Sequence, residues 1–215
     1  CKMIISDKGK SFLFTDLNKI LFLNRNKFKN IIFCEENKFF QIISSLKIGF
    51  FCIDKYTCSV FENEILNSKF KNLSNIDPIY EFKSIKNSIE IKNTAKAHIE
   101  DGIAVTKFLY WYKNNNQKIT EKKLEEKLEN FRRKSKYYLF PSFDTIAGSG
   151  KNGAIVHYRA TKNNTKLLKK NELFLCDSGG QYKFGTTDVT RTICFNNQNK
   201  KIKDIFTNVL KGHIA

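Results

Sequence analysis

Apolar residues in the first part of the chain gather in short runs that are separated by polar stretches. These runs lie at residues 3–5, 12–14, 31–33 and 49–53. Runs of this length predict β-strands, and the sequence Asp-Lys-Gly at residues 7–9 predicts a turn between the first two. Between the third and fourth runs, Phe39, Ile43 and Leu46 recur at helical spacing. We therefore expect a small α/β unit over residues 1–84.

The second part of the chain opens with two segments of helical periodicity. Residues 88–112 are predicted to form one long helix. Its predicted buried face, in steps of three and four, consists of Ala95, Ile99, Gly102, Val105, Leu109 and Tyr112. A second helix is predicted after Thr120, a good N-cap, with Glu121 in the first turn to suit the helix dipole. Its predicted buried stripe consists of Leu124, Leu128 and Phe131.

Strand-like segments follow these helices. Residues 140–195 contain short apolar runs that alternate with glycine-rich turns, and residues 202–215 return to a helical pattern. Helices followed by a block of antiparallel-looking strands predict an α+β domain over residues 85–215. The fold class expected for the chain is therefore α+β, with an α/β unit at its N-terminal end.

The chain is strongly basic, with a formal net charge of +17. Such a charge is typical of proteins that bind nucleic acid or anionic membranes. Here the lysines are spread along the whole chain and form no basic tail, so solvated surfaces explain them and we expect no nucleic-acid partner. No apolar run reaches the roughly 18 residues of a membrane span, so we expect no membrane association. Because the first residue is Cys1, we expect the reading frame to begin upstream.

The six cysteines show no metal-binding or redox spacing. No C-x-x-C pair occurs, and Cys34, Cys52, Cys176 and Cys194 lie in apolar, strand-like runs. Cysteines in such positions are typical of buried, reduced thiols in a reducing compartment. The sequence therefore predicts a cytoplasmic protein.

Two aspartates flank the most informative stretch of the chain. Asp177 ends one apolar run and Asp188 opens the next, so a hairpin turning near Tyr182 and Lys183 would make the two aspartates cross-strand neighbours. Directly opposite residues have Cβ atoms about 4.5–5.5 Å apart, and carboxylates at that distance repel unless a cation or a proton lies between them. Dinuclear hydrolase sites hold their metals about 3.5–4 Å apart, and hard oxygen ligands suit Mn²⁺ or Mg²⁺. On spacing alone, two exposed aspartates at hairpin ends remain the better interpretation.

Four strings surrounding these aspartates change that balance. They are FDTIAGSG at residues 143–150, NGAIVHYRAT at 152–161, DSGGQY at 177–182 and GTTDVTRT at 185–192. In this order they resemble successive motifs of aminopeptidase P, in the M24 creatinase/methionine aminopeptidase superfamily with the pita-bread fold. The resemblance covers residues 86–215. It implies that residues 1–84 are the end of a creatinase-N-like domain and residues 85–215 the first half of a pita-bread catalytic domain.

The resemblance also implies roles for individual residues. Asp177 matches a metal-binding aspartate that chelates one ion, and Asp188 matches one that bridges two ions. His157 matches a site histidine that contacts the substrate and the developing oxyanion, although a lone histidine on a strand is more often structural. Thr190 shares a strand face with Asp188 and is a candidate to support the ligands by hydrogen bonding. Turn residues depart from the family pattern at Lys151, where Pro is frequent, and at Phe184, where Asp is frequent.

The implied function is a metal-dependent aminopeptidase that releases the first residue of Xaa-Pro peptides, using two divalent ions, with Mn²⁺ favoured. A homodimer is expected because the family is often dimeric. The family's remaining ligands, one histidine and two glutamates, are expected after Ala215, so these 215 residues alone are expected to be inactive and poorly soluble. The alternatives are a prolidase or methionine aminopeptidase, a non-catalytic pita-bread binding module, and a basic nucleic-acid-binding protein.

Overall fold

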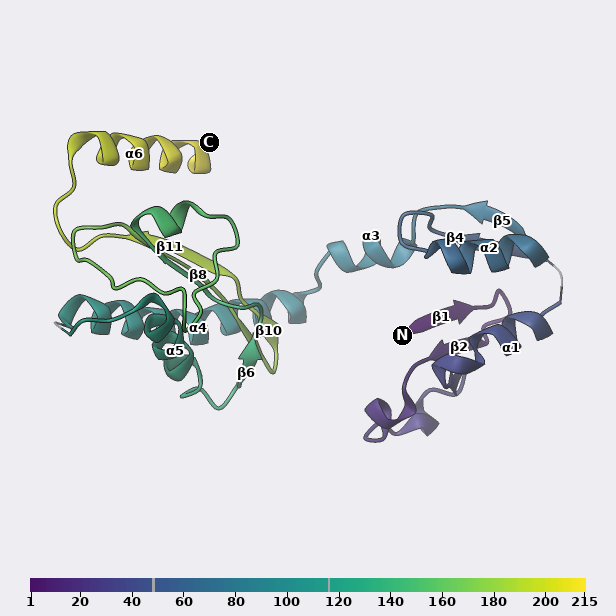
Figure 1. Ribbon diagram of the computed structural model, residues 1–215. Coiled ribbons are helices and arrows are strands. Elements are labelled where there is room, and N and C mark those ends of the chain that lie inside the picture. The colour runs from purple at the N-terminus through teal and green to yellow at the C-terminus, as the bar shows by residue number, and fades with distance from the viewer. Residues whose placement is uncertain (48, 116) are drawn as a thin grey trace. The chain divides into compact units, whose positions relative to one another are not determined.

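The computed structural model describes residues 1–47, 49–115 and 117–215. The chain forms two compact units, Cys1–Ile85 and Lys86–Ala215 (Figure 1). Each unit has its own hydrophobic core. The assignment of the first unit to a creatinase-N-like domain, and of the second to half of a catalytic domain, stays a prediction.

The first unit contains two small sheets. Its strands are β1 (Lys2–Ile5), β2 (Ser11–Phe14), β3 (Ile31–Cys34), β4 (Phe50–Ile53) and β5 (Lys71–Ser74). Strands β1 and β2 form an antiparallel hairpin whose turn contains Gly9, at a φ of 78° that favours glycine. Strand β2 pairs in parallel with β3, and β4 pairs in parallel with β5. All four strands predicted in this region are therefore confirmed.

Short helices cover the core of the first unit. They are the 3₁₀-helices η1 (Leu17–Ile20), η2 (Arg25–Lys27) and η3 (Glu36–Lys38), and the α-helices α1 (Phe39–Ser45), α2 (Val60–Lys69) and α3 (Pro78–Ser84). Helix α1 buries Phe39 and Ile43, as their spacing predicts, and Leu46 ends it. Ser59 and Glu62 start α2 with reciprocal hydrogen bonds between side chain and backbone. The core consists of Phe14, Phe39, Ile43, Ile53, Leu66 and Phe70.

Helix α4 (Ser88–Asn114) confirms the long helix that was predicted at the start of the second unit. Asn87 and Glu90 cap its N-terminus with reciprocal hydrogen bonds. The predicted buried face is wrong in the first half of the helix, where Ala95, Ile99 and Gly102 are exposed. In the second half Tyr112 is buried as predicted, and Val105 and Leu109 pack against the core. The buried residues of the helix are Ala97, Asp101, Ala104, Phe108 and Tyr112. Hydrophobic spacing missed this face because a charged residue, Asp101, lies at its centre.

Helix α5 (Glu121–Arg132) packs against α4 and begins at Thr120, which accepts a hydrogen bond from the Lys123 amide. Leu124 and Leu128 are fully buried, as the helical stripe predicts. Both belong to the main core of the second unit, which consists of Phe108, Tyr112, Ile119, Leu124, Leu128, Ala147, Phe174 and Cys176. Glu121 lies in the first turn of the helix, as expected, and the structure buries it completely.

Two antiparallel sheets complete the second unit. One contains β6 (Tyr138–Pro141), β9 (Gly180–Tyr182) and β10 (Gly185–Thr186), and the other contains β7 (Ile146–Ser149), β8 (Phe174–Ser178) and β11 (Val189–Ile193). The 3₁₀-helix η4 (Gly150–Ala154) follows β7. Helices followed by antiparallel strands confirm the predicted α+β class.

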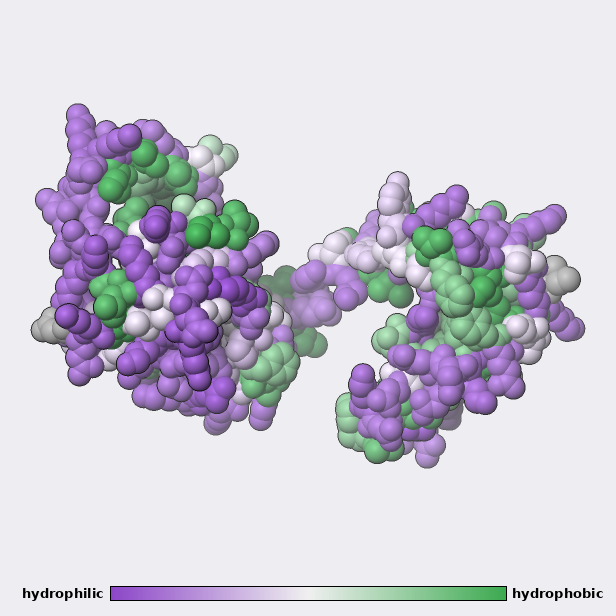
Figure 2. Space-filling view, viewed as in Figure 1, coloured by the Kyte–Doolittle hydropathy of each residue, from purple (hydrophilic) through white to green (hydrophobic). Residues whose placement is uncertain are grey.

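Helix α6 (Lys200–Ile214) ends the chain without burying any residue. Its apolar side chains and the outer residues of β11 line a groove of about 500 Å³. The lining residues include Ile205, Phe206, Val209 and Leu210, each about half exposed or more. Figure 2 shows apolar surface gathered around this hollow beside α6, at the upper left of the view.

Candidate metal centre

A single antiparallel hairpin carries both predicted metal ligands. Val189 pairs with Ser178 and Thr190 with Asp177, while Gly185 pairs with Tyr182 farther along. All of these pairs share one register, and the hairpin closes at a two-residue turn formed by Lys183 and Phe184. In that turn the Phe184 ring packs edge-on against Tyr137 at 5.0 Å, and the Lys96 ammonium lies 4.4 Å from its centroid. Phe184, which departs from the family pattern, thus serves to pack the turn.

The predicted direct pairing of Asp177 with Asp188 is wrong, because Asp177 lies opposite Thr190. The turn is centred one residue later than expected, and such a shift moves every cross-strand partner by two positions. A two-residue shift preserves the face on which a side chain lies. Asp188 is therefore a diagonal neighbour of Asp177, at a position where Cα atoms are roughly 7–8 Å apart. The two aspartates therefore lie on the same face of the hairpin.

Thr190 contacts the first of the predicted ligands. Its hydroxyl donates a hydrogen bond of 2.8 Å to Oδ1 of Asp177. Asp177 is half-buried, whereas Asp188 and Thr190 are exposed. This hydrogen bond links Thr190 to Asp177 across the hairpin, and a supporting role for Thr190 at a metal site stays a prediction.

A buried ionic network lies directly behind Asp177. Arg132 donates to Oδ1 of Asp101 at 2.6 Å and to Ser178 Oγ at 3.0 Å. The Tyr182 hydroxyl donates to Asp101 at 2.9 Å, and burial, followed by the charge of Asp101, raises the pKa of Tyr182. All four side chains are at most 2% exposed. The network fixes Ser178, the neighbour of Asp177, to α4 and α5.

The close approach of neighbouring backbone at Gly179 explains part of the Asp-Ser-Gly-Gly string. A Cβ atom on Gly179 would overlap the carbonyl oxygen of Thr187 and the hydroxyl of Ser142. The Ser142 hydroxyl donates a hydrogen bond of 2.9 Å to that carbonyl, so the segment between β10 and β11 approaches very closely here. The Thr187 hydroxyl accepts a hydrogen bond of 2.9 Å from the Gly180 amide. Glycine at residue 179 is thus required for the backbone to pass between β8 and β9.

His157 lies in a turn and not on a strand, which corrects the expectation from sequence. Its side chain is exposed, and its φ of 56° is the one positive value among non-glycine residues in the described parts of the chain. The residues that follow pack inward, where Tyr158 and Ala160 form a small cluster with Ile146. Because Ile146 pairs with Asp177, this cluster ties the His157 segment to the strand that carries the first aspartate.

The donor atoms of the site suit divalent cations, but they do not complete a coordination sphere. Asp177 and Asp188 offer carboxylate oxygens, the ligands that Mn²⁺ and Mg²⁺ prefer. Within residues 1–47, 49–115 and 117–215, no group of three or more His, Cys, Asp or Glu side chains converges on one point. These residues therefore fit part of a metal centre. The identity of the metal and the roles of the individual ligands stay predictions.

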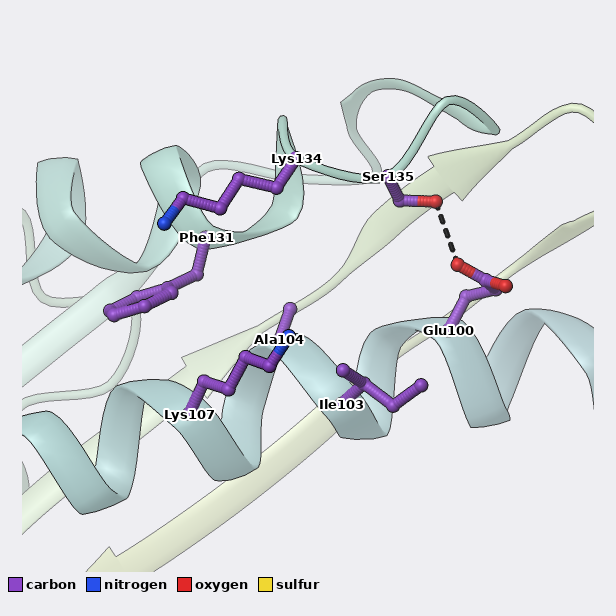
Figure 3. A pocket seen from close by; sticks show the side chains of 7 residues that line it. All are labelled: Glu100, Ile103, Ala104, Lys107, Phe131, Lys134 and Ser135. Carbon is purple, nitrogen blue, oxygen red and sulfur yellow. Dashed lines mark hydrogen bonds between the residues drawn. The ribbon is translucent and has the colours of Figure 1, made fainter.

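A second, smaller pocket lies away from the hairpin, between α4 and α5. Its volume is about 150 Å³, and it is lined by Glu100, Ile103, Ala104, Lys107, Phe131, Lys134 and Ser135. Figure 3 shows Ser135 and Glu100 joined by a hydrogen bond of 2.8 Å at one end of this pocket. None of the predicted site residues lines it, so it contributes nothing to the candidate centre.

The helices and cysteines of the structure bear on two expectations from the sequence, the absence of a membrane span and the presence of reduced thiols. Among the helices in the described parts of the chain, none combines the length and the apolar character that a membrane crossing requires. All six cysteines are free of disulfide bonds.

Comparison with solved structures shows the fold. The chain superimposes on an X-prolyl aminopeptidase from Caenorhabditis elegans with a TM-score of 0.74 and 24% identity, covering 89% of this chain and 33% of that one. A prolidase from Pyrococcus furiosus matches with a TM-score of 0.71 and 24% identity, over 94% of this chain and 58% of that one. Both are M24 enzymes of the pita-bread architecture, so the fold expected from the sequence strings is confirmed.

Comparison of sequences is more specific for the second unit. A probable Xaa-Pro aminopeptidase P from Laccaria bicolor is 44% identical over 141 residues, which is 64% of this chain and 22% of that protein. An Xaa-Pro aminopeptidase from Drosophila melanogaster is 38% identical over 150 residues, or 68% of this chain and 24% of its own length. The chain thus matches less than a quarter of the length of these relatives. Residues 92–215 match the sequence profile of metallopeptidase family M24, and this match spans the hairpin and the His157 turn. The chain therefore belongs to metallopeptidase family M24.

Proposed function

We propose that the intact protein is a metal-dependent aminopeptidase that releases the N-terminal residue from Xaa-Pro peptides. The observation that carries this proposal is the hairpin, in which Asp177 accepts a hydrogen bond from Thr190 and Asp188 lies diagonally across the same pairing. This hairpin lies inside residues 92–215, which match metallopeptidase family M24. The chain is also 38–44% identical to Xaa-Pro aminopeptidases of other organisms over part of its length.

The chemistry divides between the metals and the side chains. Asp177 and Asp188 would hold divalent ions, which when bound would supply Lewis-acid polarisation of a carbonyl and activation of a water molecule. His157, whose side chain is exposed in its turn, would donate a hydrogen bond to the oxygen on which negative charge develops. The Xaa–Pro bond has no N–H, so a site that cleaves it must bind the peptide without that donor.

The remaining parts of the proposal concern the metal cofactors, the cellular location, the substrates and the oligomeric state. The Caenorhabditis elegans relative, described as a cytosolic enzyme with a di-nuclear active site, supports two metal ions here. The resemblance to aminopeptidase P favours Mn²⁺, and the two aspartates are hard oxygen ligands that suit Mn²⁺ or Mg²⁺. That relative also supports a cytoplasmic location, and six unbonded cysteines suit the reducing cytoplasm that we propose for this protein. The substrates would be proline-containing peptides, and the intact protein would be a homodimer.

The first test is peptide cleavage by the intact protein. With Mn²⁺ present, we expect release of the first residue from an Xaa-Pro-Xaa tripeptide, measured by mass spectrometry of the products. Asp177→Asn should reduce kcat/KM at least 100-fold, since loss of a direct ligand exceeds the roughly 10–100-fold cost of losing a supporting group. Asp204→Asn is the matched control, because Asp204 is an exposed aspartate on α6. An unaffected Asp177→Asn variant, or an inactive wild type, would contradict the proposal.

A prolidase activity is the second candidate, because solved prolidases match this fold nearly as well as the aminopeptidase does. The same assay separates the two activities when the tripeptide is compared with the dipeptide Xaa-Pro. An aminopeptidase of the proposed kind favours the tripeptide, whereas a prolidase favours the dipeptide. Stoichiometric Mn²⁺ binding without cleavage of either peptide would instead favour a non-catalytic binding module.

A further inference from the structure

We propose that Glu121, at the start of α5, is a positioning residue that holds the His157 turn in its active conformation. The proposal rests on the proposed function, because it assigns His157 a role at the reacting carbonyl. Glu121 itself touches no reacting atom in this view. Its action is to organise the backbone and side chains on both sides of His157.

The Glu121 carboxylate lies at the centre of a buried cluster of hydrogen-bond donors. Its side chain has no exposed surface. Oε1 accepts from the Ser149 amide at 2.8 Å and from Asn152 Nδ2 at 3.1 Å. Oε2 accepts from the Tyr158 hydroxyl at 2.8 Å and from the Lys166 amide at 2.9 Å. Four donors therefore converge on one carboxylate.

These donors enclose the turn in sequence and in space. Ser149 ends β7, and Asn152 lies in η4, both before His157. Tyr158 follows His157 directly, and its hydroxyl also accepts a hydrogen bond of 3.0 Å from Asn152 Nδ2. Lys166 lies beyond the loop, where its carbonyl accepts from the Glu121 amide at 3.0 Å. One side chain thus fastens both ends of the segment that presents His157.

The backbone of this segment requires such support. His157 has a φ of 56°, a conformation that residues other than glycine adopt at a cost and keep only where their surroundings impose it. A Cβ on Gly148 would lie 2.8 Å from Gly153 Cα, so η4 packs directly onto β7. The close packing and the Glu121 hydrogen bonds together supply the restraint that maintains the turn.

The chemistry of the cluster selects glutamate at this position. A carboxylate has two acceptor oxygens and no donor, which matches four converging donors. Glutamine has the same shape but offers only one acceptor oxygen. In either orientation its NH₂ group would face one of the two backbone amides, of Ser149 or Lys166, and leave that amide without an acceptor. Glu121→Gln is therefore a substitution of constant volume that weakens the turn specifically.

The experiment combines a structural and a kinetic measurement on the intact protein. Trypsin can cleave the segment at Lys151 and Arg159, which are both exposed. Glu121→Gln should speed cleavage at these two positions about 10-fold or more, because local opening becomes more favourable. In the peptide assay the same variant should lose about 10–100-fold in kcat, with KM and Mn²⁺ affinity close to wild type.

Two controls separate positioning from general stability. Leu124→Ala removes a fully buried side chain from the same helix without touching the cluster. Glu172→Gln changes a nearby carboxylate that accepts from the Ser149 hydroxyl and Lys166 Nζ. Neither variant should accelerate cleavage at Lys151 and Arg159 relative to other sites. Equal acceleration in Leu124→Ala and Glu121→Gln would overturn the proposal.

A double-mutant cycle with His157→Ala provides the decisive kinetic test. If Glu121 acts through His157, Glu121→Gln should cost little further kcat in the His157→Ala background. Fully additive losses would overturn the positioning role. Failure of the proposed function would look different, because the wild-type protein would then cleave no Xaa-Pro peptide. The proteolysis measurement would still test whether Glu121 holds the turn.

Discussion

Individual buried polar side chains organise the second unit. Asp101 and Arg132 form an ion pair inside the unit, and Glu121 gathers donors from three segments. Such groups are costly to bury, so each requires a full set of partners. Each of these residues joins a helix to a part of the site: Arg132 to the strand of Asp177, and Glu121 to the turn of His157.

Arg132 offers a test of this dependence at a single position. We expect Arg132→Met to lower the free energy of unfolding by about 3–5 kcal/mol, because it leaves the Asp101 carboxylate buried without its cation. Urea unfolding of the intact protein, followed by circular dichroism, measures the change. The double variant Asp101→Leu with Arg132→Met should be more stable than Arg132→Met alone. A loss below about 1 kcal/mol in the single variant would show that the pair is not structurally important.

The raised pKa of Tyr158 predicts how the stability of the protein changes at alkaline pH. Burial, followed by its hydrogen bond to Glu121, raises the pKa of Tyr158 from its ordinary 10.0 to about 12. The unfolded state therefore loses its phenolic proton first, so the contribution of Tyr158 is complete below about pH 10 and disappears as the pH rises toward 12. Tyr158→Phe should lower stability at pH 8 and flatten its decline above pH 10.

Thermal unfolding between pH 8 and 11.5 measures this dependence. Some decline should persist in Tyr158→Phe, since burial also raises the pKa of Tyr112 to about 12. A variant that matches wild type at every pH would contradict the assignment of the hydrogen bond between Tyr158 and Glu121.

At the scale of elements, the β8–β11 hairpin determines the geometry of the candidate centre. Its register places Thr190, and not Asp188, opposite Asp177. Gly179 allows β8 to continue into β9 where any larger residue would overlap Thr187 and Ser142. The hairpin is held from behind by the hydrogen bond from Arg132 to Ser178. Strand pairing and helix packing therefore act together on the position of Asp177.

Thr190→Val tests the contribution of the hairpin to metal binding. The substitution keeps the shape of the side chain and removes the hydrogen bond to Asp177. We expect the intact protein to bind Mn²⁺ about 10–100-fold more weakly, as calorimetric titration would show. Thr192→Val is the matched control, because Thr192 lies on the same strand and pairs with Leu175. Equal Mn²⁺ affinities in the two variants would show that Thr190 does not support metal binding.

At the scale of the whole molecule, the chain has two notable properties. It exposes an apolar groove, and it supplies only a small number of candidate metal ligands. Helix α6 buries no residue, and its apolar side chains face a groove that β11 also lines. The described residues bring no third metal-binding side chain to Asp177 and Asp188. Exposed apolar surface of this extent favours association between molecules.

The 215-residue chain by itself should therefore behave differently from the intact protein. We expect it to aggregate at concentrations where the intact protein stays soluble, and to bind no stoichiometric Mn²⁺ in calorimetry. Light scattering of matched samples measures the first property. A monodisperse chain that binds Mn²⁺ at one or two equivalents would contradict both expectations and show that these residues complete a site.

Much of the local structure was predictable from the sequence, and so was the family. Caps such as Thr120, turn residues such as Gly9 and short apolar runs act within a few positions, so the sequence alone determined most of the elements. The strings at residues 143–192 likewise identified the family, since long ordered strings are specific. The roles of Asp177, Asp188 and His157 remain predictions that rest on those strings.

Only the tertiary structure decided which face of α4 is buried, where the hairpin turns, and which residues support the site. Asp101 and Glu121 are buried because partners far away in the sequence, Arg132 and Tyr158, are brought beside them. A charged side chain becomes a core residue only when such partners repay its desolvation. Hydrophobic periodicity carries no information about pairs of this kind, because their spacing in the sequence is arbitrary and their energy arises only on folding.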